Sequence, residues 1–174
     1  RLGITTTFVD PSDPSNFKKA VQENTRAFFV ESLGNPKLDV LDLKAISAEA
    51  KASKVPFIVD NTVASPYLLN PIQFGADIVI HSLTKYITGN GTSLGGVIID
   101  AGNFDWTNGK FPEFTEPSAG YHGLVYHEAL GKAAFIAKVR IEGLRDYGAA
   151  LSPFNAFQII QGLETLPIRI QRHS

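Results

Sequence analysis

The sequence predicts an α/β fold, with a mostly parallel sheet and helices on both of its faces. Two short apolar runs, at residues 57–60 and 77–81, end in polar residues, as buried parallel strands do because they need no polar alternation. Another apolar run at residues 25–31 precedes a stretch at residues 39–53 in which apolar side chains recur at helical spacing. This strand–helix–strand order indicates a right-handed βαβ unit, and therefore a parallel pair of strands.

The elements before this unit are shorter. Residues 1–10 are rich in β-branched side chains that alternate with other residues, which predicts a strand. A cluster of Asp, Pro and Ser at residues 10–14 predicts a turn. Residues 17–23 are then expected to form a short helix, with Ser15 or Asn16 as its N-cap.

The second half of the chain continues the alternation of strands and helices. The apolar run at residues 95–100 predicts a further strand. Residues 102–122 form a long connection rich in Gly, Pro and aromatic side chains, and loops of this length are usually functional or lie at an interface. Residues 124–144 are expected to be largely helical, and a final helix has Pro153 in its first turn and is kinked or ended by Pro167.

Composition excludes several classes of protein. The 174 residues fit within one domain, and 44% hydrophobic with 19% charged residues is typical of a folded globular core. A net charge of −1 gives no footprint for nucleic acid or an anionic membrane, and no apolar run approaches the ~20 residues that span a bilayer. Cysteine is absent, which rules out disulfides and thiolate zinc sites. Methionine is also absent and the chain opens with Arg1, so we expect a fragment or processed product of a cytoplasmic protein.

Asp60 and Lys85 occupy the positions at which an α/β sheet builds a site. Asp60 ends the apolar run at residues 57–60, and Lys85 follows the run at residues 77–81. Because ligands gather at the carboxyl ends of such strands, we expect the two side chains to lie side by side. Pyridoxal phosphate (PLP) enzymes need both groups, since a lysine amine forms a Schiff base with the cofactor and a carboxylate partners its pyridinium nitrogen.

The motif Ser82-Leu83-Thr84-Lys85-Tyr86, with Asp60-Asn61-Thr62 upstream, resembles the Cys/Met-metabolism family of PLP-dependent enzymes. The resemblance covers essentially all 174 residues, and the segment at 102–124 looks like the O-acetylhomoserine sulfhydrylase branch. It implies the large domain of a fold type I, aspartate aminotransferase-like transferase. The chain would be the central part of that PLP-binding domain, with the N-terminal arm and the C-terminal domain absent.

The resemblance assigns three residues to the cofactor ring. Lys85 would form the Schiff base, and its place after a buried strand would favour the neutral amine by desolvation; the alternative is an ordinary surface lysine. Asp60 would keep the pyridine nitrogen protonated, or else be a turn residue at a strand end. Thr62 would flank the ring, or simply pack in the interior.

Three more residues match polar contacts of the family. The hydroxyls of Ser82 and Thr84 would donate to the phosphate, unless they cap the following turn locally. Asn35 would bond the phenolic oxygen of the cofactor, although Asn before Pro is also common in turns. Glu31 is interpreted as a strand-end carboxylate that lies near the substrate in some relatives.

The remaining motifs are weaker. The Gly-rich run at residues 88–92 lacks the Gly-Lys-Ser/Thr ending of a P-loop, so we interpret it as a turn. The four histidines have no spacing typical of a metal site, and no metal is predicted. His81 adjoins the proposed site, but we interpret it as a packed strand-end residue.

The family reaction implied by the resemblance is γ-replacement, in which O-acetylhomoserine and sulfide give homocysteine and acetate. Lys85 would act as the base that moves protons between carbons. The alternatives are a cystathionine γ-synthase or γ-lyase of the same family, and an inactive binding scaffold. The expected partners are the amino-acid substrate, sulfide and further copies of the chain in a dimer of dimers. Because the family's substrate-carboxylate arginine lies in a segment absent here, we expect the chain alone to be inactive or nearly so.

Overall fold

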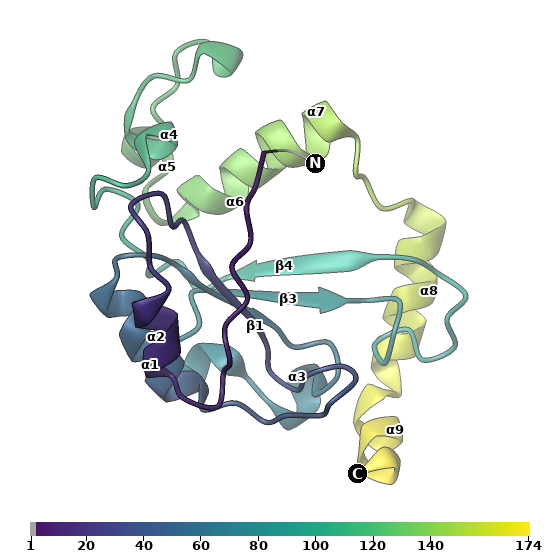
Figure 1. The fold of residues 1–174 in the computed structure, drawn as a ribbon. Helices are drawn as coiled ribbons and strands as arrows, with labels where there is room; N and C mark the ends of the chain where they lie inside the picture. Colours follow the sequence, from purple (N-terminus) through teal and green to yellow (C-terminus); the bar gives the residue numbers. More distant parts are fainter. Residues whose placement is uncertain (1–2) are drawn as a thin grey trace.

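The computed structural model describes residues 3–174, and its centre is a four-stranded sheet (Figure 1). The strands lie in the order β1 (Phe28–Glu31), β2 (Phe57–Asp60), β3 (Ile78–Ser82) and β4 (Gly96–Asp100). The first three strands are parallel, with Glu31 beside Asp60 and Asp60 beside Ile80, and β4 runs antiparallel to β3. The prediction of a mostly parallel sheet is therefore confirmed.

One face of the sheet packs against α1 (Ser15–Lys19) and α2 (Leu43–Ala52). Side chains alternate along β2, so Phe57 and Val59 point into this core and are 0% exposed. Helix α2 has Asp42 as its N-cap, since the carboxylate accepts from Ala45 N (3.0 Å). The helix predicted at 39–53 is thus confirmed, with a later start. The other buried members of this core are Phe17, Phe28, Val30, Leu43, Ile46, Ala50, Val55, Ala76 and Val79.

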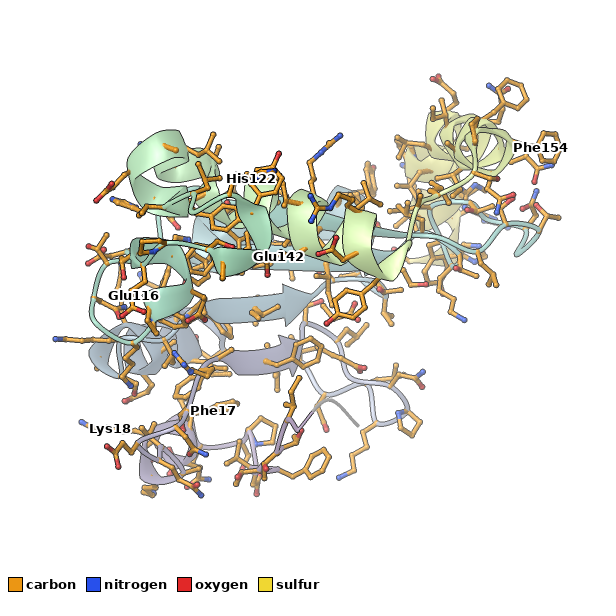
Figure 2. The ribbon with its side chains drawn as sticks, turned by 90° about the horizontal axis from the view of Figure 1, so that it is seen from above. Phe17, Lys18, Glu116, His122, Glu142 and Phe154 are labelled. Atoms are coloured by element: carbon orange, nitrogen blue, oxygen red, sulfur yellow. The ribbon has the colours of Figure 1, made fainter. Side chains whose placement is uncertain are left out.

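The opposite face is covered by the chain that follows β4, including α5 (Tyr126–Leu130) and α6 (Ala134–Lys138). Trp106 stacks on Phe114 and Phe135, with ring centroids 4.3 and 5.2 Å apart, and meets Phe111 edge-on at 5.1 Å. Much of the long connection predicted at 102–122 is therefore a structural layer on the sheet. Figure 2 shows this layer and α1 on opposite sides of the strands, so helices cover both faces as predicted.

The remaining helical elements are short, except for the last two. They are α3 (Ser65–Leu68), α4 (Pro112–Thr115), α7 (Arg145–Tyr147), α8 (Pro153–Glu164) and α9 (Leu166–His173), with 3₁₀ turns at Pro71–Phe74, Ala119–Tyr121 and Gly131–Ala133 and a π-helical turn at Val139–Leu144. Ser152 caps α8 by accepting from Asn155 N (3.1 Å), and Pro167 lies in the first turn of α9, which confirms the predicted break. Within residues 3–174, no helix is long and apolar enough to cross a membrane.

The strand predicted at residues 1–10 is wrong where the structure describes it. Residues 3–10 form no strand and run over the outside of the molecule, with Ile4 79% and Phe8 93% exposed (Figure 1). The start of that prediction, Arg1 and Leu2, lies outside the described residues. Alternating β-branched residues favour an extended backbone, but a strand also needs a neighbour with which to exchange hydrogen bonds.

The first helix is shorter than predicted and differs in its cap. Helix α1 has Pro14 at the N-cap position, without a side-chain cap bond. Asp13 instead accepts hydrogen bonds from the amide and the hydroxyl of Ser15, at 2.9 and 2.8 Å. The cap assigned to Ser15 or Asn16 is therefore wrong, because the carboxylate just before the helix takes that role.

Candidate active site

The carboxyl ends of β1, β2 and β3 meet at one edge of the sheet, and a cavity of about 630 Å³ lies there. This volume is in the range of sites for small ligands and cofactors. The six residues predicted to contact a cofactor all line it: Asn35, Asp60, Thr62, Ser82, Thr84 and Lys85. The structure therefore brings together the carboxylate and the lysine that the sequence placed at neighbouring strand ends.

Asp60 is held in place by Thr62. Its Oδ1 accepts hydrogen bonds from the amide (2.9 Å) and the hydroxyl (2.6 Å) of Thr62. The same hydroxyl accepts from the amide of Ser82 (2.8 Å), so it links the end of β2 to the end of β3. Among residues 3–174, no donor bonds Oδ2 of Asp60, which leaves that oxygen available to a ligand. The sequence did not predict this linking role of Thr62.

Lys85 lies in the turn that follows β3. Its amide donates to Ser82 O (3.4 Å), and its carbonyl accepts from Gly89 N (2.8 Å). The turn carries the residue beyond the sheet edge, where it is exposed. The expectation that the preceding strand desolvates the amine is therefore wrong for this chain. The ion pairs formed within residues 3–174 do not include Lys85, so no carboxylate in the described part of the chain holds its side chain.

The hydroxyls of Ser82 and Thr84 differ in their availability. Thr84 Oγ1 accepts from Gly95 N (3.1 Å) and donates to Gly95 O (3.3 Å), which fixes the turn to the chain entering β4. This bonding is neither the predicted phosphate contact nor a local cap of the following turn, because Gly95 lies eleven residues further along the chain. In the described part of the chain the Ser82 hydroxyl has no partner, and it lines the cavity. Of the two predicted phosphate ligands, Ser82 has the free donor.

Glu31 and Asn35 form another wall of the cavity. Glu31 ends β1, and its Oε2 accepts from the backbone amide of Asn35 (2.7 Å). A bond from an amide to a carboxylate is stronger than one between neutral groups, so it orders the loop that carries Asn35. Glu31 therefore acts on the position of Asn35, a role that the sequence did not show.

Asn61, next to Asp60 in the chain, fixes the backbone beneath the cavity through its side-chain hydrogen bonds. It is 0% exposed, and its Oδ1 accepts from the Ser32 hydroxyl (2.7 Å). Its Nδ2 donates to the carbonyls of Ser65 (3.1 Å) and Leu69 (2.8 Å). These bonds fix the backbone next to Asp60. Sequence reasoning assigned Asn61 no role, and the signal that could have found it was its place between two candidate site residues.

Two residues of α9 also line the cavity, Arg169 and His173. Arg169 donates to the carbonyl of Tyr86, which lies 83 residues earlier in the chain (2.7 Å). The ring of His173 lies 5.8 Å from that of Tyr86, measured between centroids. No local pattern in the sequence could indicate either residue, because their place in the site depends on how α9 returns to the sheet edge.

The weaker motifs are structural. Gly89 and Gly91 have positive φ, +86° and +66°, which supports the interpretation of the Gly-rich run as a turn. His81 is 6% exposed on β3. Burial lowers the pKa of His81, so its ring stays neutral near pH 7, as expected of a packed strand residue.

The class of protein follows from the comparison with known families. The model of the Cys/Met metabolism PLP-dependent enzyme family matches residues 1–174, the whole chain. The chain therefore belongs to this family, as the motif around Lys85 indicated. The predicted dependence on PLP is confirmed as a property of the family.

Two curated relatives place the chain within the family more narrowly. It is 59% identical to the O-acetyl-L-homoserine sulfhydrylase of Leptospira meyeri, over 100% of this chain and 41% of that protein. It is 52% identical to the O-acetyl-L-homoserine sulfhydrylase of Corynebacterium glutamicum, again over 100% of this chain and 41% of that protein. The chain thus spans 41% of the length of these relatives.

Solved structures show the same fold. A putative O-acetylhomoserine (thiol)-lyase from Campylobacter jejuni is 42% identical, with a TM-score of 0.90 over 95% of this chain and 41% of that one, and it contains a pyridoxyl-lysine monophosphate. The O-acetylhomoserine sulfhydrylase of Wolinella succinogenes is 39% identical, with a TM-score of 0.79 over 93% of this chain and 43% of that one. The prediction of a fold type I α/β fold is confirmed.

The polar groups around the cavity fit a PLP molecule. The amine of Lys85 could carry the covalent link, and the free oxygen of Asp60 could accept a proton shared with the ring nitrogen. The Ser82 hydroxyl and the side-chain amide of Asn35 could donate to the oxygen atoms of the cofactor. The cavity therefore offers an amine, a carboxylate and neutral donors, which is the set that this cofactor requires.

Proposed function

We propose that the chain is the central part of the PLP-binding domain of an O-acetylhomoserine sulfhydrylase. The complete enzyme would convert O-acetylhomoserine and sulfide into homocysteine and acetate by γ-replacement. The observation that carries the proposal is the single cavity lined by both Lys85 and Asp60, in a chain 59% identical to a relative with that name. The O-acetylhomoserine sulfhydrylase of Wolinella succinogenes, which catalyses sulfur transfer in methionine biosynthesis, supports the same choice.

Four residues hold the cofactor in this proposal. Lys85 attaches it, Asp60 pairs with its ring nitrogen, and Ser82 and Asn35 bond its oxygen atoms. Thr84 adds a further phosphate contact once its hydroxyl turns from Gly95, to which it is bonded in this structure. When bound, PLP draws electrons from the α-carbon of the amino acid, which makes the proton on that carbon acidic.

The chain itself supplies proton transfer and orientation. Once substrate has displaced it, the Lys85 amine takes the proton from the α-carbon and delivers protons to the neighbouring carbons as acetate leaves the γ-carbon and sulfur joins it. Thr62 keeps Asp60 at the strand end through two hydrogen bonds, of 2.9 and 2.6 Å, so the carboxylate does not rotate away from the ring. Thr62 therefore orients Asp60 and need not flank the ring.

The complete enzyme is proposed to be a cytoplasmic homo-oligomer, a dimer of dimers, with an N-terminal arm and a C-terminal domain outside this chain. Large apolar side chains left exposed on α8, such as Phe154 (66%) and Phe157 (59%), support the presence of covering segments or copies (Figure 2). Because the substrate-carboxylate arginine of the family is proposed to lie in that C-terminal domain, the isolated chain is expected to be inactive or nearly so.

The test uses the full-length enzyme that contains this segment. PLP is expected to give the visible absorbance of a lysine-bound cofactor, which O-acetylhomoserine shifts and which Lys85→Ala abolishes together with homocysteine formation. Lys44→Ala, on the exposed side of α2, is the matched control and should change neither.

Different outcomes point to different alternatives. Cystathionine formed from cysteine, with no homocysteine from sulfide, would instead make the enzyme a cystathionine γ-synthase, and elimination without an acceptor a γ-lyase. Absorbance that no substrate shifts would leave an inactive scaffold. Absorbance that survives in Lys85→Ala would overturn the assignment of the lysine and with it the proposed function.

A further inference from the structure

The turn that carries Lys85 is held by a side chain from the other end of the chain. Arg169 on α9 donates from Nη1 to Tyr86 O (2.7 Å) and from Nη2 to Ile87 O (3.2 Å), the two carbonyls directly after Lys85. Its Nη2 also donates to Gly162 O (2.7 Å), at the end of α8. One planar guanidinium therefore joins the lysine turn to the junction of α8 and α9.

The turn does not satisfy these two carbonyls by itself. Its internal bonds run from Thr88 N to Leu83 O (3.0 Å) and from Gly89 N to Lys85 O (2.8 Å), which leaves the two carbonyls after Lys85 without a donor from the turn. Ile87 is 6% exposed, so water has little access there. Because a buried carbonyl without a donor is costly, the bond to Ile87 O completes the hydrogen bonding of the turn. The bond to Tyr86 O, on an exposed residue, attaches the turn at a second point.

Two glycines allow this close approach. A Cβ added at Gly89 would lie 2.7 Å from Cζ of Arg169, and one added at Gly162 would lie 2.3 Å from Thr88 O. A side chain at Gly89 would displace the guanidinium of Arg169, and one at Gly162 would require the backbone of the turn to move. An apolar cluster separate from the two sheet cores fills the same junction: Ile87, Ile159, Leu166 and Ile170.

We propose that Arg169 is a positioning residue for the reaction, because it fixes the backbone from which Lys85 projects and so sets where the amine stands in the cavity. The inference rests on the proposed function. The remaining bond of the guanidinium also goes to a neutral oxygen, from Nε to Thr165 Oγ1 (3.0 Å). The ion pairs within residues 3–174 do not include Arg169, so its contribution is the fixed geometry of a planar fork and not an attraction between charges.

Lysine cannot replace arginine in this arrangement. A single ammonium has three donors on one atom, whereas the bonds to Tyr86 O, Ile87 O and Gly162 O leave from two nitrogens of a rigid plane. Arg169→Lys therefore keeps the charge and loses the geometry. Arg172→Ala, on the exposed side of the same helix, removes a cation without touching the turn and is the matched control.

The experiment compares these variants in the full-length enzyme loaded with PLP. Arg169→Ala and Arg169→Lys are expected to lower kcat by about 10- to 100-fold, the range expected when a reacting group is misplaced by about an ångström, with KM little changed. The pH midpoint of the lysine-bound cofactor absorbance should move, because the amine stands in a new environment. Guanidinium ion added to Arg169→Ala should restore part of kcat, and Arg172→Ala should match the wild type throughout.

Hydrogen exchange on the same proteins without substrate gives a readout that does not depend on turnover. The amides of Thr88 and Gly89 are expected to exchange faster in both Arg169 variants and at the wild-type rate in Arg172→Ala. A lower melting temperature with unchanged kcat, midpoint and exchange would make Arg169 a merely structural residue and overturn the inference. Should Arg169→Ala fail to fold, Arg169→Lys decides the question on the same readouts. Absorbance that persists in Lys85→Ala would refute the proposed function instead.

Discussion

Replacing Thr62 by valine keeps the shape and β-branching of the side chain and removes one hydroxyl. That hydroxyl donates to the Asp60 carboxylate (2.6 Å) and accepts from Ser82 N (2.8 Å). A hydrogen bond to a charged group contributes about 1.5–3 kcal/mol, and a buried amide left without an acceptor costs about 1–3 kcal/mol. Because Thr62 is only half-buried and water can replace part of the loss, we expect a decrease of about 2–3 kcal/mol in the free energy of unfolding.

The chain contains a matched control for this substitution. Thr107 donates its amide (2.8 Å) and hydroxyl (2.6 Å) to Oδ1 of Asp105, the same pattern that joins Thr62 to Asp60. Thr107 is exposed and lies away from the cavity, so Thr107→Val should cost well under half as much.

Urea unfolding of the full-length enzyme without PLP, followed by circular dichroism, measures both effects. Titration of PLP should in addition show weaker cofactor binding for Thr62→Val only, because only that variant frees the carboxylate that faces the ring. Thr62→Ser retains the hydroxyl and should recover most of both losses. Equal effects of Thr62→Val and Thr107→Val would refute the argument that the bond between strand ends carries the difference.

Two further predictions concern groups outside the ring contacts. Asn61→Ala leaves the Ser32 hydroxyl and two backbone carbonyls without their partner in a fully buried place. It should lower the free energy of unfolding by about 3 kcal/mol or more. A loss under about 1 kcal/mol in urea unfolding would contradict the role of Asn61 in fixing the backbone next to Asp60. Burial raises the pKa of Asp77 despite the hydrogen bond that it accepts from Phe57 N (2.9 Å). The folded state therefore binds the proton of Asp77 more tightly than the unfolded state does. As the pH rises through the folded pKa, this carboxyl group lowers the free energy of unfolding. Asp77→Asn should therefore gain stability relative to the wild type between pH 4 and pH 7, and a difference that does not change with pH in urea unfolding would contradict that sign.

The sheet could be predicted from the sequence because its strands carry their own signal. The run at residues 57–60 is apolar and ends in Asp60, and the structure shows a strand over that range with alternate residues fully buried. The failure at residues 3–10 has the opposite origin, since an extended pattern does not reveal whether a neighbouring strand exists. The cap of the first helix was also mispredicted, because Pro14 takes the N-cap position and Asp13, just outside α1, accepts from the amide and hydroxyl of Ser15.

The site was predictable as far as single residues could be matched to a motif. The six candidates line one cavity, but the sequence did not show which hydroxyl is free, and Thr84 is occupied by Gly95. It also did not show that Lys85 is exposed, because the turn after β3 decides this. Arg169 could not be inferred at all, since its contacts join positions 82 and 83 residues apart. Contacts of that kind depend on the tertiary fold and produce no periodic pattern in the sequence.

The antiparallel direction of β4 separates two tasks within the chain. Gly96 pairs with Ser82 at the site, and Asp100 pairs with Ile78 at the far end, so the strand carries the chain about 14 Å from the cavity before the aromatic segment begins. Among the described residues that line the cavity, none belongs to the stretch at 92–168. The connection at residues 102–122, which resembles one branch of the family, therefore bears on the cavity only through the sheet that it covers.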